Sequence, residues 1–189
     1  MPAGRRDREL LDTLDALPCQ PFEGTAWRVT QDIRDPTIFR SGGARWDDGT
    51  FDVLYTSLDR EGALAEMRFH VTRGQPVIPS RKVYHLHQLE VSLRGVLDLT
   101  DWEMLERFGV ERATYGRLPY LGRESEYTAC QKIGEAVNFL GGAAENEPSG
   151  FIVPNARREG RNLVILGAHV GGDDVRPVHD HGPIDWSSI

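Results

Sequence analysis

The chain has 189 residues, 39% of them hydrophobic, and a formal net charge of −7, so we expect one folded domain rather than a disordered chain. An acidic protein lacks the basic face that sequence-independent binding to nucleic acid requires. The two cysteines, Cys19 and Cys130, are too few and too distant for a disulfide framework or a thiolate zinc site.

The N-terminus is charged and is not followed by a long apolar stretch, so we expect no secretory signal and a cytoplasmic location. A helix from about residue 7 to 17 is predicted, because leucines recur on one helical face at positions 10, 11, 14 and 17, and Pro18 then ends it. We expect three parts: an N-terminal helix at residues 1–20, the main domain at 21–175, and a C-terminal tail at 176–189.

Two short strands and a loop follow the first helix. Residues 25–29 are predicted as a strand that carries Trp27 and Arg28 on opposite faces. Residues 34–50 are rich in Gly, Asp and Pro and are typical of a loop. Residues 51–55 are predicted as the next strand. Taken alone, Arg28 is equally compatible with an edge-strand arginine in solvent.

A helix is predicted from a cap at Ser57 or Asp59 to about residue 71. Its apolar stripe consists of Ala63, Leu64, Met67 and Val71. Glu66 falls at the edge of that stripe, where a carboxylate can face a cleft without being sealed in the core. The alternative is an ordinary surface glutamate.

The second half of the chain predicts a strand at residues 83–93, a short helix opened by a capping box at Thr100-Asp101-Trp102-Glu103, and a helix at 127–140. Strands are predicted near 151–153 and 163–166, and the second of these apolar runs is far too short to cross a bilayer. Strands and helices alternate irregularly, so the sequence predicts an α+β fold with a bent mixed β-sheet.

Histidines occur in two groups, His85 with His87 and His179-Asp180-His181. Such residues can bind a metal, but neither group has a third ligand at a recognisable spacing. We therefore expect no metal site.

Four polar motifs come early in the chain: Thr25-Ala26-Trp27-Arg28, Gly43-Ala44-Arg45-Trp46, Tyr55-Thr56-Ser57 and Glu66. Arginines can hold a diphosphate, an aromatic ring can stack on a heterocycle, and a carboxylate can oppose positive charge on a ribose. Together with the segment at residues 150–164, this order of motifs resembles the RES domain family. The resemblance implies a fold like that of ADP-ribosylating toxins, with an NAD cleft between two halves of the sheet.

The resemblance also implies roles for these residues, with NAD as the substrate and no metal. Arg28 and Arg45 are expected to hold the phosphates, and Tyr55 to stack on nicotinamide or ribose. Glu66 is expected to be the main catalytic residue, with Arg28 and Tyr55 assisting.

The segment Pro154-Asn155-Ala156-Arg157 departs from the family pattern, which has a serine where this chain has Asn155. An amide can donate and accept hydrogen bonds as a hydroxyl does, so Asn155 is expected to contact NAD, and Arg157 to reach a phosphate. Ser149 is out of register and is not assigned the serine role.

The resemblance implies a toxin of a bacterial type II toxin–antitoxin system, of the kind found in RES-Xre pairs. Such an ADP-ribosyltransferase cleaves the nicotinamide–ribose bond of NAD and transfers ADP-ribose, here to a host metabolic protein. One alternative is an NAD phosphorylase or glycohydrolase, and a second is a non-catalytic nucleotide-binding module, for which Asn155 is the argument. The expected partner is a cognate antitoxin that blocks the cleft, with neither nucleic acid nor membrane involved.

Overall fold

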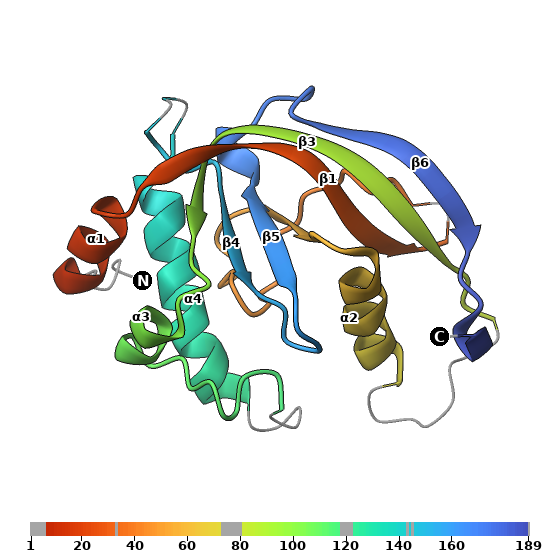
Figure 1. Cartoon of the computed structure of the whole chain (residues 1–189), viewed down its shortest axis with the longest axis horizontal. Helices are drawn as coiled ribbons and strands as arrows, with labels where there is room; N and C mark the ends of the chain where they lie inside the picture. The colour runs from red at the N-terminus through yellow and green to blue at the C-terminus, as the bar shows by residue number, and fades with distance from the viewer. Residues whose placement is uncertain are drawn as a thin grey trace.

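The computed structural model describes residues 7–32, 34–72, 81–117, 123–142, 144 and 146–188. Figure 1 shows the arrangement of its elements. In chain order these are α1 (Arg8–Asp15), β1 (Cys19–Gln31), β2 (Val53–Ser57), α2 (Arg60–Thr72), β3 (Tyr84–Asp98), α3 (Trp102–Arg107), α4 (Arg123–Leu140), β4 (Gly150–Pro154), β5 (Arg161–Leu166), the 3-10 turn η2 (Gly167–His169), β6 (Val175–Pro183) and the 3-10 turn η3 (Trp186–Ser188).

Aspartates begin three of the helices, because a carboxylate there accepts hydrogen bonds from amides that have no partner inside the helix. Asp7 caps α1 with two such bonds. Of the two candidates for α2, Asp59 is the cap, with a 2.6 Å bond to the amide three residues later. The N-cap of α3 is Asp101, one residue after the predicted Thr100.

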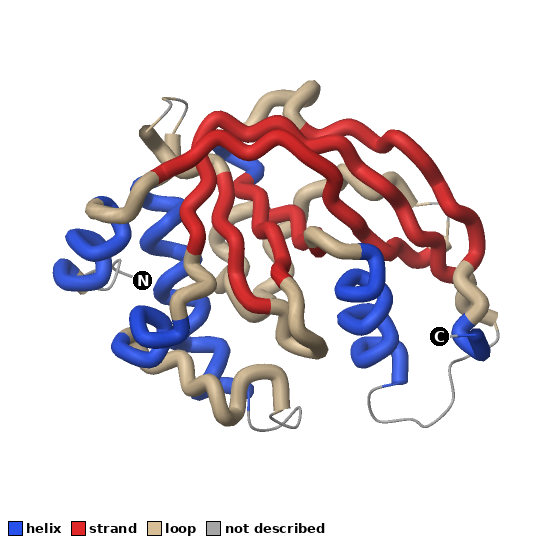
Figure 2. The backbone as a smooth tube through the Cα atoms, viewed as in Figure 1, coloured by secondary structure: helices blue, strands red, loops and turns tan. Residues whose placement is uncertain are grey.

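The six strands form one mixed sheet in the order β1-β2-β5-β4-β3-β6, and β1 also pairs with β3. The pairings from β1 through β2, β5, β4 and β3 back to β1 therefore form a closed ring. β3 and β4 are parallel, and the other pairs are antiparallel. Figure 2 shows how strongly β1 and β3 curve over the other elements. The predicted α+β fold with a bent mixed sheet is confirmed.

Three apolar clusters hold these elements together. One lies between α1, α3 and α4 and a face of β2, β4 and β5, and a second fills the ring of strands. The paired residues Phe151 and Val164 belong to the first cluster, and their neighbours Ile152 and Leu163 belong to the second, as the alternation of side chains requires. The third cluster packs α2 against β1 and β3.

The first strand is longer than predicted, since β1 begins at Cys19 rather than near residue 25. Its early part is half exposed, contains Pro21 and Gly24, and shows no clear apolar alternation. The pairing of β1 with β3 is irregular between Gln20 and Phe22, and proline is accommodated at such a bulge because it has no amide to donate.

The C-terminal segment also differs from the expectation of a tail at residues 176–189. Residues Val175–Pro183 form β6, which pairs antiparallel with β3 and ends the sheet. Most of its side chains are exposed, and polar residues are mixed with prolines and a glycine, so the sequence lacks the apolar alternation by which strands are recognised. Backbone pairing with β3, rather than side-chain burial, keeps this segment in the sheet.

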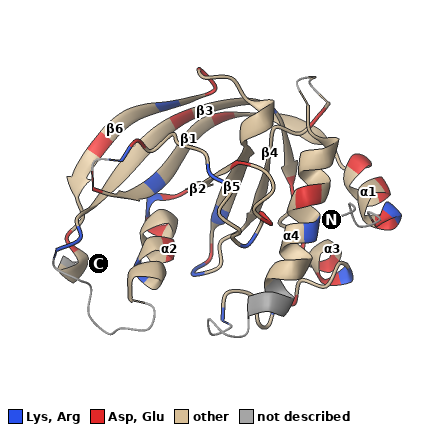
Figure 3. Cartoon of the chain, turned by 180° about the vertical axis from the view of Figure 1, so that it is seen from behind, with Lys and Arg blue, Asp and Glu red and all other residues tan. Residues whose placement is uncertain are grey.

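Acidic and basic positions are interspersed along the helices and outer strands (Figure 3). Within the described residues, no helix combines the length and apolar character needed to span a bilayer.

Candidate active site

A cavity of about 280 Å³ opens where β1 and β2 meet α2, and we call it the central cavity. Its walls also include the loop that follows β1 and the turn between β4 and β5. Five of the six residues expected at the site line it, namely Arg28, Arg45, Tyr55, Glu66 and Arg157. Each of these residues comes from a different segment, so the fold brings together side chains that are as many as 129 positions apart in the case of Arg28 and Arg157.

Glu66 projects from α2 toward the turn between β4 and β5. Its Oε1 accepts hydrogen bonds from the amide of Ala156 at 3.0 Å and from Nδ2 of Asn162 at 3.2 Å. Its Oε2 lies 3.4 Å from Nε of Arg157. The side chain is 22% exposed, so the carboxylate is held in a defined orientation while it still borders the cavity. This geometry suits a charge that must be fixed before the reaction begins.

Arg157 is the cation nearest to that carboxylate. Its guanidinium carbon lies 3.3 Å from the centroid of the Phe69 ring, and Nη1 donates to the carbonyl of Gly116. Burial lowers the pKa of Arg157, and the charge of Glu66 acts in the opposite direction. Nε is buried and faces Oε2 of Glu66 at 3.4 Å, so this ion pair orients the guanidinium beside the cavity.

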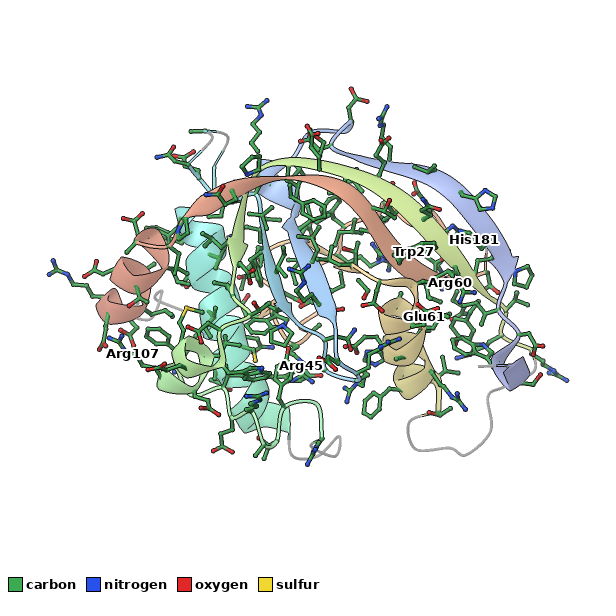
Figure 4. The ribbon with its side chains drawn as sticks, viewed as in Figure 1. Trp27, Arg45, Arg60, Glu61, Arg107 and His181 are labelled. Carbon is green, nitrogen blue, oxygen red and sulfur yellow. The ribbon has the colours of Figure 1, made fainter. Side chains whose placement is uncertain are left out.

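Arg45, labelled in Figure 4, lies on the loop between β1 and β2 and lines the central cavity. Its guanidinium carbon is 4.5 Å from the centroid of the Tyr115 ring and 5.2 Å from that of Tyr127. A guanidinium is attracted to the faces of aromatic rings. The two rings therefore fix the direction of Arg45 without neutralising its charge.

Asp47 organises the Arg45 loop, although sequence reasoning did not single it out. The side chain is almost fully buried, and its two oxygens accept from the amides of Gly43 at 2.6 Å and Ala44 at 2.9 Å. Oδ2 also accepts from the Tyr55 hydroxyl at 2.9 Å. Aspartate side chains commonly bond to backbone amides three or four residues earlier, as Asp47 does here. The sequence therefore contained a signal for this role.

Tyr55 borders the cavity through its ring, as expected, but its hydroxyl belongs to the scaffold. That oxygen donates to Asp47 and accepts from the amide of Trp46 at 2.9 Å. Burial raises the pKa of Tyr55 well above its ordinary value, and the charge of Asp47 adds to this effect. The phenol therefore stays protonated at neutral pH and acts as a fixed donor rather than as an acid or base.

We expect Asp47→Ala to destabilise the protein and to weaken the site together. Loss of the carboxylate leaves two loop amides and the Tyr55 hydroxyl without their acceptor, each at a cost of about 1–3 kcal/mol if they stay buried. Arg45 then loses its defined position, and the affinity for an anionic ligand should fall by about tenfold. The KM for NAD in the nicotinamide-release reaction measures this fall. Asp48→Ala is the control, because that exposed carboxylate binds only within its own turn at Thr50, and an equal fall there would contradict the role of Asp47.

Arg28 is held differently from the other two arginines. Trp27 and Arg28 point to opposite faces of β1, as predicted, since Arg28 pairs with His87 while its neighbour Val29 packs in the cluster beneath α2. Nη1 of Arg28 donates to the carbonyls of Pro36 at 3.1 Å and Ile38 at 3.3 Å. Arg28 therefore supports the loop after β1 as well as lining the central cavity, and it is not a solvated edge residue.

Burial is the main reason that the pKa of Arg28 falls to about 10, and the positive charge of Arg40 lowers it further, while Asp35 raises it. At neutral pH Arg28 is still a cation. It is a cation that lacks a well-placed counter-charge, since its hydrogen bonds go to backbone carbonyls.

Asn155 does not line the central cavity, contrary to the expectation that it contacts NAD. The side chain is buried. Its Oδ1 accepts from the amides of Arg157 at 2.8 Å and Arg158 at 3.3 Å, and Nδ2 donates to Oδ1 of Asn162 at 2.9 Å. An asparagine at this position closes the turn between β4 and β5 and orients Asn162, which in turn binds Glu66. Its contribution to the site is indirect.

The two histidine groups meet across β3 and β6. His85 Nδ1 is 3.0 Å from Oδ2 of Asp180, and His87 Nε2 is 2.9 Å from Oγ1 of Thr30. Among the described residues, no group of three or more His, Cys, Asp or Glu side chains has the geometry to hold a metal ion. Figure 4 shows His181 of β6 close to Trp27 of β1, and their ring centroids are 5.2 Å apart across β3.

Comparison with known proteins gives two results. The family model described as the RES domain matches residues 25–187. Among solved structures, the chain is similar to a chain of the crystal structure of the M. tuberculosis MbcT–MbcA toxin–antitoxin complex, with a TM-score of 0.74 and 23% sequence identity over 93% of this chain and 92% of that one. At this identity the likeness shows a shared fold. A search of curated proteins gave no match.

Proposed function

The chain belongs to the RES domain family, and from this premise we propose that it is the toxin of a bacterial type II toxin–antitoxin system. In this proposal it cleaves the bond between nicotinamide and ribose in NAD and transfers ADP-ribose to an acceptor, a host metabolic protein. The observation that carries the proposal is Glu66, an oriented carboxylate at the edge of a cavity whose other charged walls are arginines. The similar fold found in a toxin–antitoxin complex supports it.

The chemistry requires little of the protein beyond orientation and charge. When the bond from C1′ of the ribose to the nicotinamide nitrogen breaks, the electron pair stays on the nitrogen, and the cationic ring leaves as a neutral molecule. Positive charge then develops on the ribose, as in glycoside hydrolysis, where a carboxylate beside the sugar stabilises it. An acceptor oxygen or nitrogen forms the new bond to C1′ and releases its proton.

The described residues can take the roles this reaction needs. Glu66 opposes the charge on the ribose, and because its orientation is fixed beforehand, little reorganisation is needed in the transition state. Arg45 and Arg157 flank the same cavity and favour an anionic substrate. The ring of Tyr55 forms a flat wall on which nicotinamide or ribose can pack. No metal has a role in this scheme.

Release of nicotinamide from NAD by the purified protein is the test of this proposal, and chromatography follows it directly. We expect release that depends on Glu66. Stimulation by inorganic phosphate, with formation of ADP-ribose 1″-phosphate, would assign phosphorolysis, and free ADP-ribose would assign hydrolysis. Labelling of a lysate protein from NAD labelled in the adenylate would assign protein transfer. The absence of nicotinamide release under all three conditions would contradict catalysis and favour the binding module.

The proposed partner is an antitoxin encoded beside this gene, which occupies the central cavity. A carboxylate-bearing segment of such a protein would meet the arginines that otherwise hold the substrate. Co-expression should then restore growth, and the purified complex should bind NAD more weakly than the free chain does. A complex that binds NAD as tightly as the free chain would exclude this form of inhibition.

A further inference from the structure

A second cavity, of about 360 Å³, adjoins the central cavity. The two share four lining residues, Arg28, Val29, Met67 and His70. Three arginines line the second cavity, Arg28, Arg34 and Arg40, and we call it the arginine cavity. It lies along the free side of the last residues of β1, where the loop after that strand folds back.

Residues 34–40, which line this cavity, are anchored by polar contacts. Oγ1 of Thr30 donates to the carbonyl of Arg34 at 3.3 Å, and Arg28 donates to the carbonyls of residues 36 and 38. The backbone of Arg40 pairs with Val53 through two hydrogen bonds of 3.0 and 3.1 Å. The arginine side chains therefore project from an anchored backbone rather than from a loose loop.

The charge of this cavity is poorly balanced. Neither the Arg34 nor the Arg40 guanidinium forms an ion pair or hydrogen bond with the residues that the structure describes. Asp35 is the lone carboxylate among the lining residues, and it is already engaged with the amide and hydroxyl of Thr37 at 2.8 and 2.6 Å. Arg28 and Arg40 are close enough to repel each other. A bound anion would relieve this repulsion.

The central cavity is also small for a whole dinucleotide. Pockets that enclose a drug-sized ligand have volumes of roughly 300–1,000 Å³, and the central cavity, at about 280 Å³, falls just below this range. It suits one half of NAD. The other half must lie in a neighbouring space, and the arginine cavity adjoins the central cavity at Arg28.

We propose that the arginine cavity is the subsite for the phosphate-bearing adenosine half of the dinucleotide, with Arg34 and Arg40 as its anion-binding residues. This inference rests on the proposed function, since it assigns the reacting nicotinamide riboside half to the central cavity beside Glu66. Arg28, at the junction, then faces the diphosphate. Arg45 and Arg157 serve the reacting half, whereas the sequence resemblance paired Arg28 with Arg45 as a single phosphate clamp.

The first test measures binding and needs no turnover. ADP is titrated into the full-length wild-type protein and into Arg34→Ala, Arg40→Ala and the double variant by calorimetry. Each exposed arginine that contacts a phosphate should contribute about tenfold to affinity, and the loss should shrink at high salt. Arg8→Ala is the control, because that arginine lies on α1 and pairs there with Asp12. Unchanged ADP affinity in the double variant, with its melting temperature also unchanged, would overturn the proposal.

The second test separates the two halves of the substrate. Nicotinamide release is measured from NAD and from nicotinamide mononucleotide, which lacks the adenylate half. Arg40→Ala should raise KM for NAD by about tenfold and leave kcat/KM for the mononucleotide unchanged. An equal loss for both substrates would place Arg40 at the reacting half and contradict the assignment. If the wild-type protein releases nicotinamide from neither compound, the proposed function fails, and the ADP titration still decides the subsite.

Discussion

Glu66→Gln should reduce nicotinamide release by a factor on the order of a hundred or more, while the protein stays folded. Glutamine keeps an oxygen that can accept from the amide of Ala156, so the contact between α2 and the turn after β4 survives. What disappears is the negative charge, which opposes the charge on the ribose, and electrostatic contacts of this kind contribute about two to three powers of ten to a rate. Growth arrest on expression should disappear with the activity. Initial-rate measurements and a thermal melt check both parts.

Glu61→Gln is the matched control for this prediction. Glu61 is on the same helix, five residues earlier, where its 56% exposed side chain pairs with Arg60. It has the same change in charge and no contact with the cavity lining. If a folded Glu66→Gln protein releases nicotinamide at nearly the wild-type rate, this carboxylate has no role in the reaction. If Glu61→Gln loses as much activity as Glu66→Gln, the loss comes from the change in net charge and not from the position of Glu66.

Gly134→Ala should destabilise the protein and disturb the site together. α4 passes so close to the Arg45 loop that a Cβ on Gly134 would lie 1.9 Å from the carbonyl oxygen of Trp46. Because that oxygen belongs to the backbone, the loop itself must move. The cost of such overpacking is about 1–3 kcal/mol, more than the gain of about 1 kcal/mol from replacing a helical glycine by alanine. We expect a melting temperature lower by several degrees and a marked loss of activity.

Gly42→Ala tests the same substitution in the loop itself. An added Cβ at Gly42 meets no atom within 4 Å, and its φ is not positive. This variant should be neutral or slightly stabilising, because alanine restricts the unfolded chain. If Gly134→Ala melts and reacts like Gly42→Ala, the close approach of α4 does not position Arg45.

Much of the fold was predictable because several elements have strong local signals. The leucines of α1 and the apolar faces of α2 and α4 follow helical periodicity, and β4 and β5 contain short continuous apolar runs. The weak cases are β6 and the first half of β1, whose side chains are largely exposed or irregular. Their place in the sheet depends on pairing with β3, which is distant in sequence. Local periodicity cannot predict such a pairing.

In the candidate site, too, residues with a local sequence signal were predictable, and residues whose roles depend on distant contacts were not. Glu66, Arg45, Tyr55 and Arg157 were named from the order of motifs, and the fold brings them around one cavity. Asp47, Ala156 and Asn162, the last two of which bind Glu66, were missed because their roles depend on three-dimensional contacts. Asn155 is buried and its side chain bonds within the turn between β4 and β5, a role that an amide suits as well as it suits a ligand contact, and its contact with NAD stays a prediction.

The contacts of Glu66 also determine when the protein can become active during synthesis. Its oriented carboxylate is on α2, but its three partners, Ala156, Arg157 and Asn162, come from the turn between β4 and β5. Ring closure likewise requires β5 to join β2 to β4. Because such long-range contacts form late in folding, a nascent or truncated chain that ends before this hairpin contains Glu66 without an assembled site. We therefore expect the proposed activity only after most of the chain has left the ribosome.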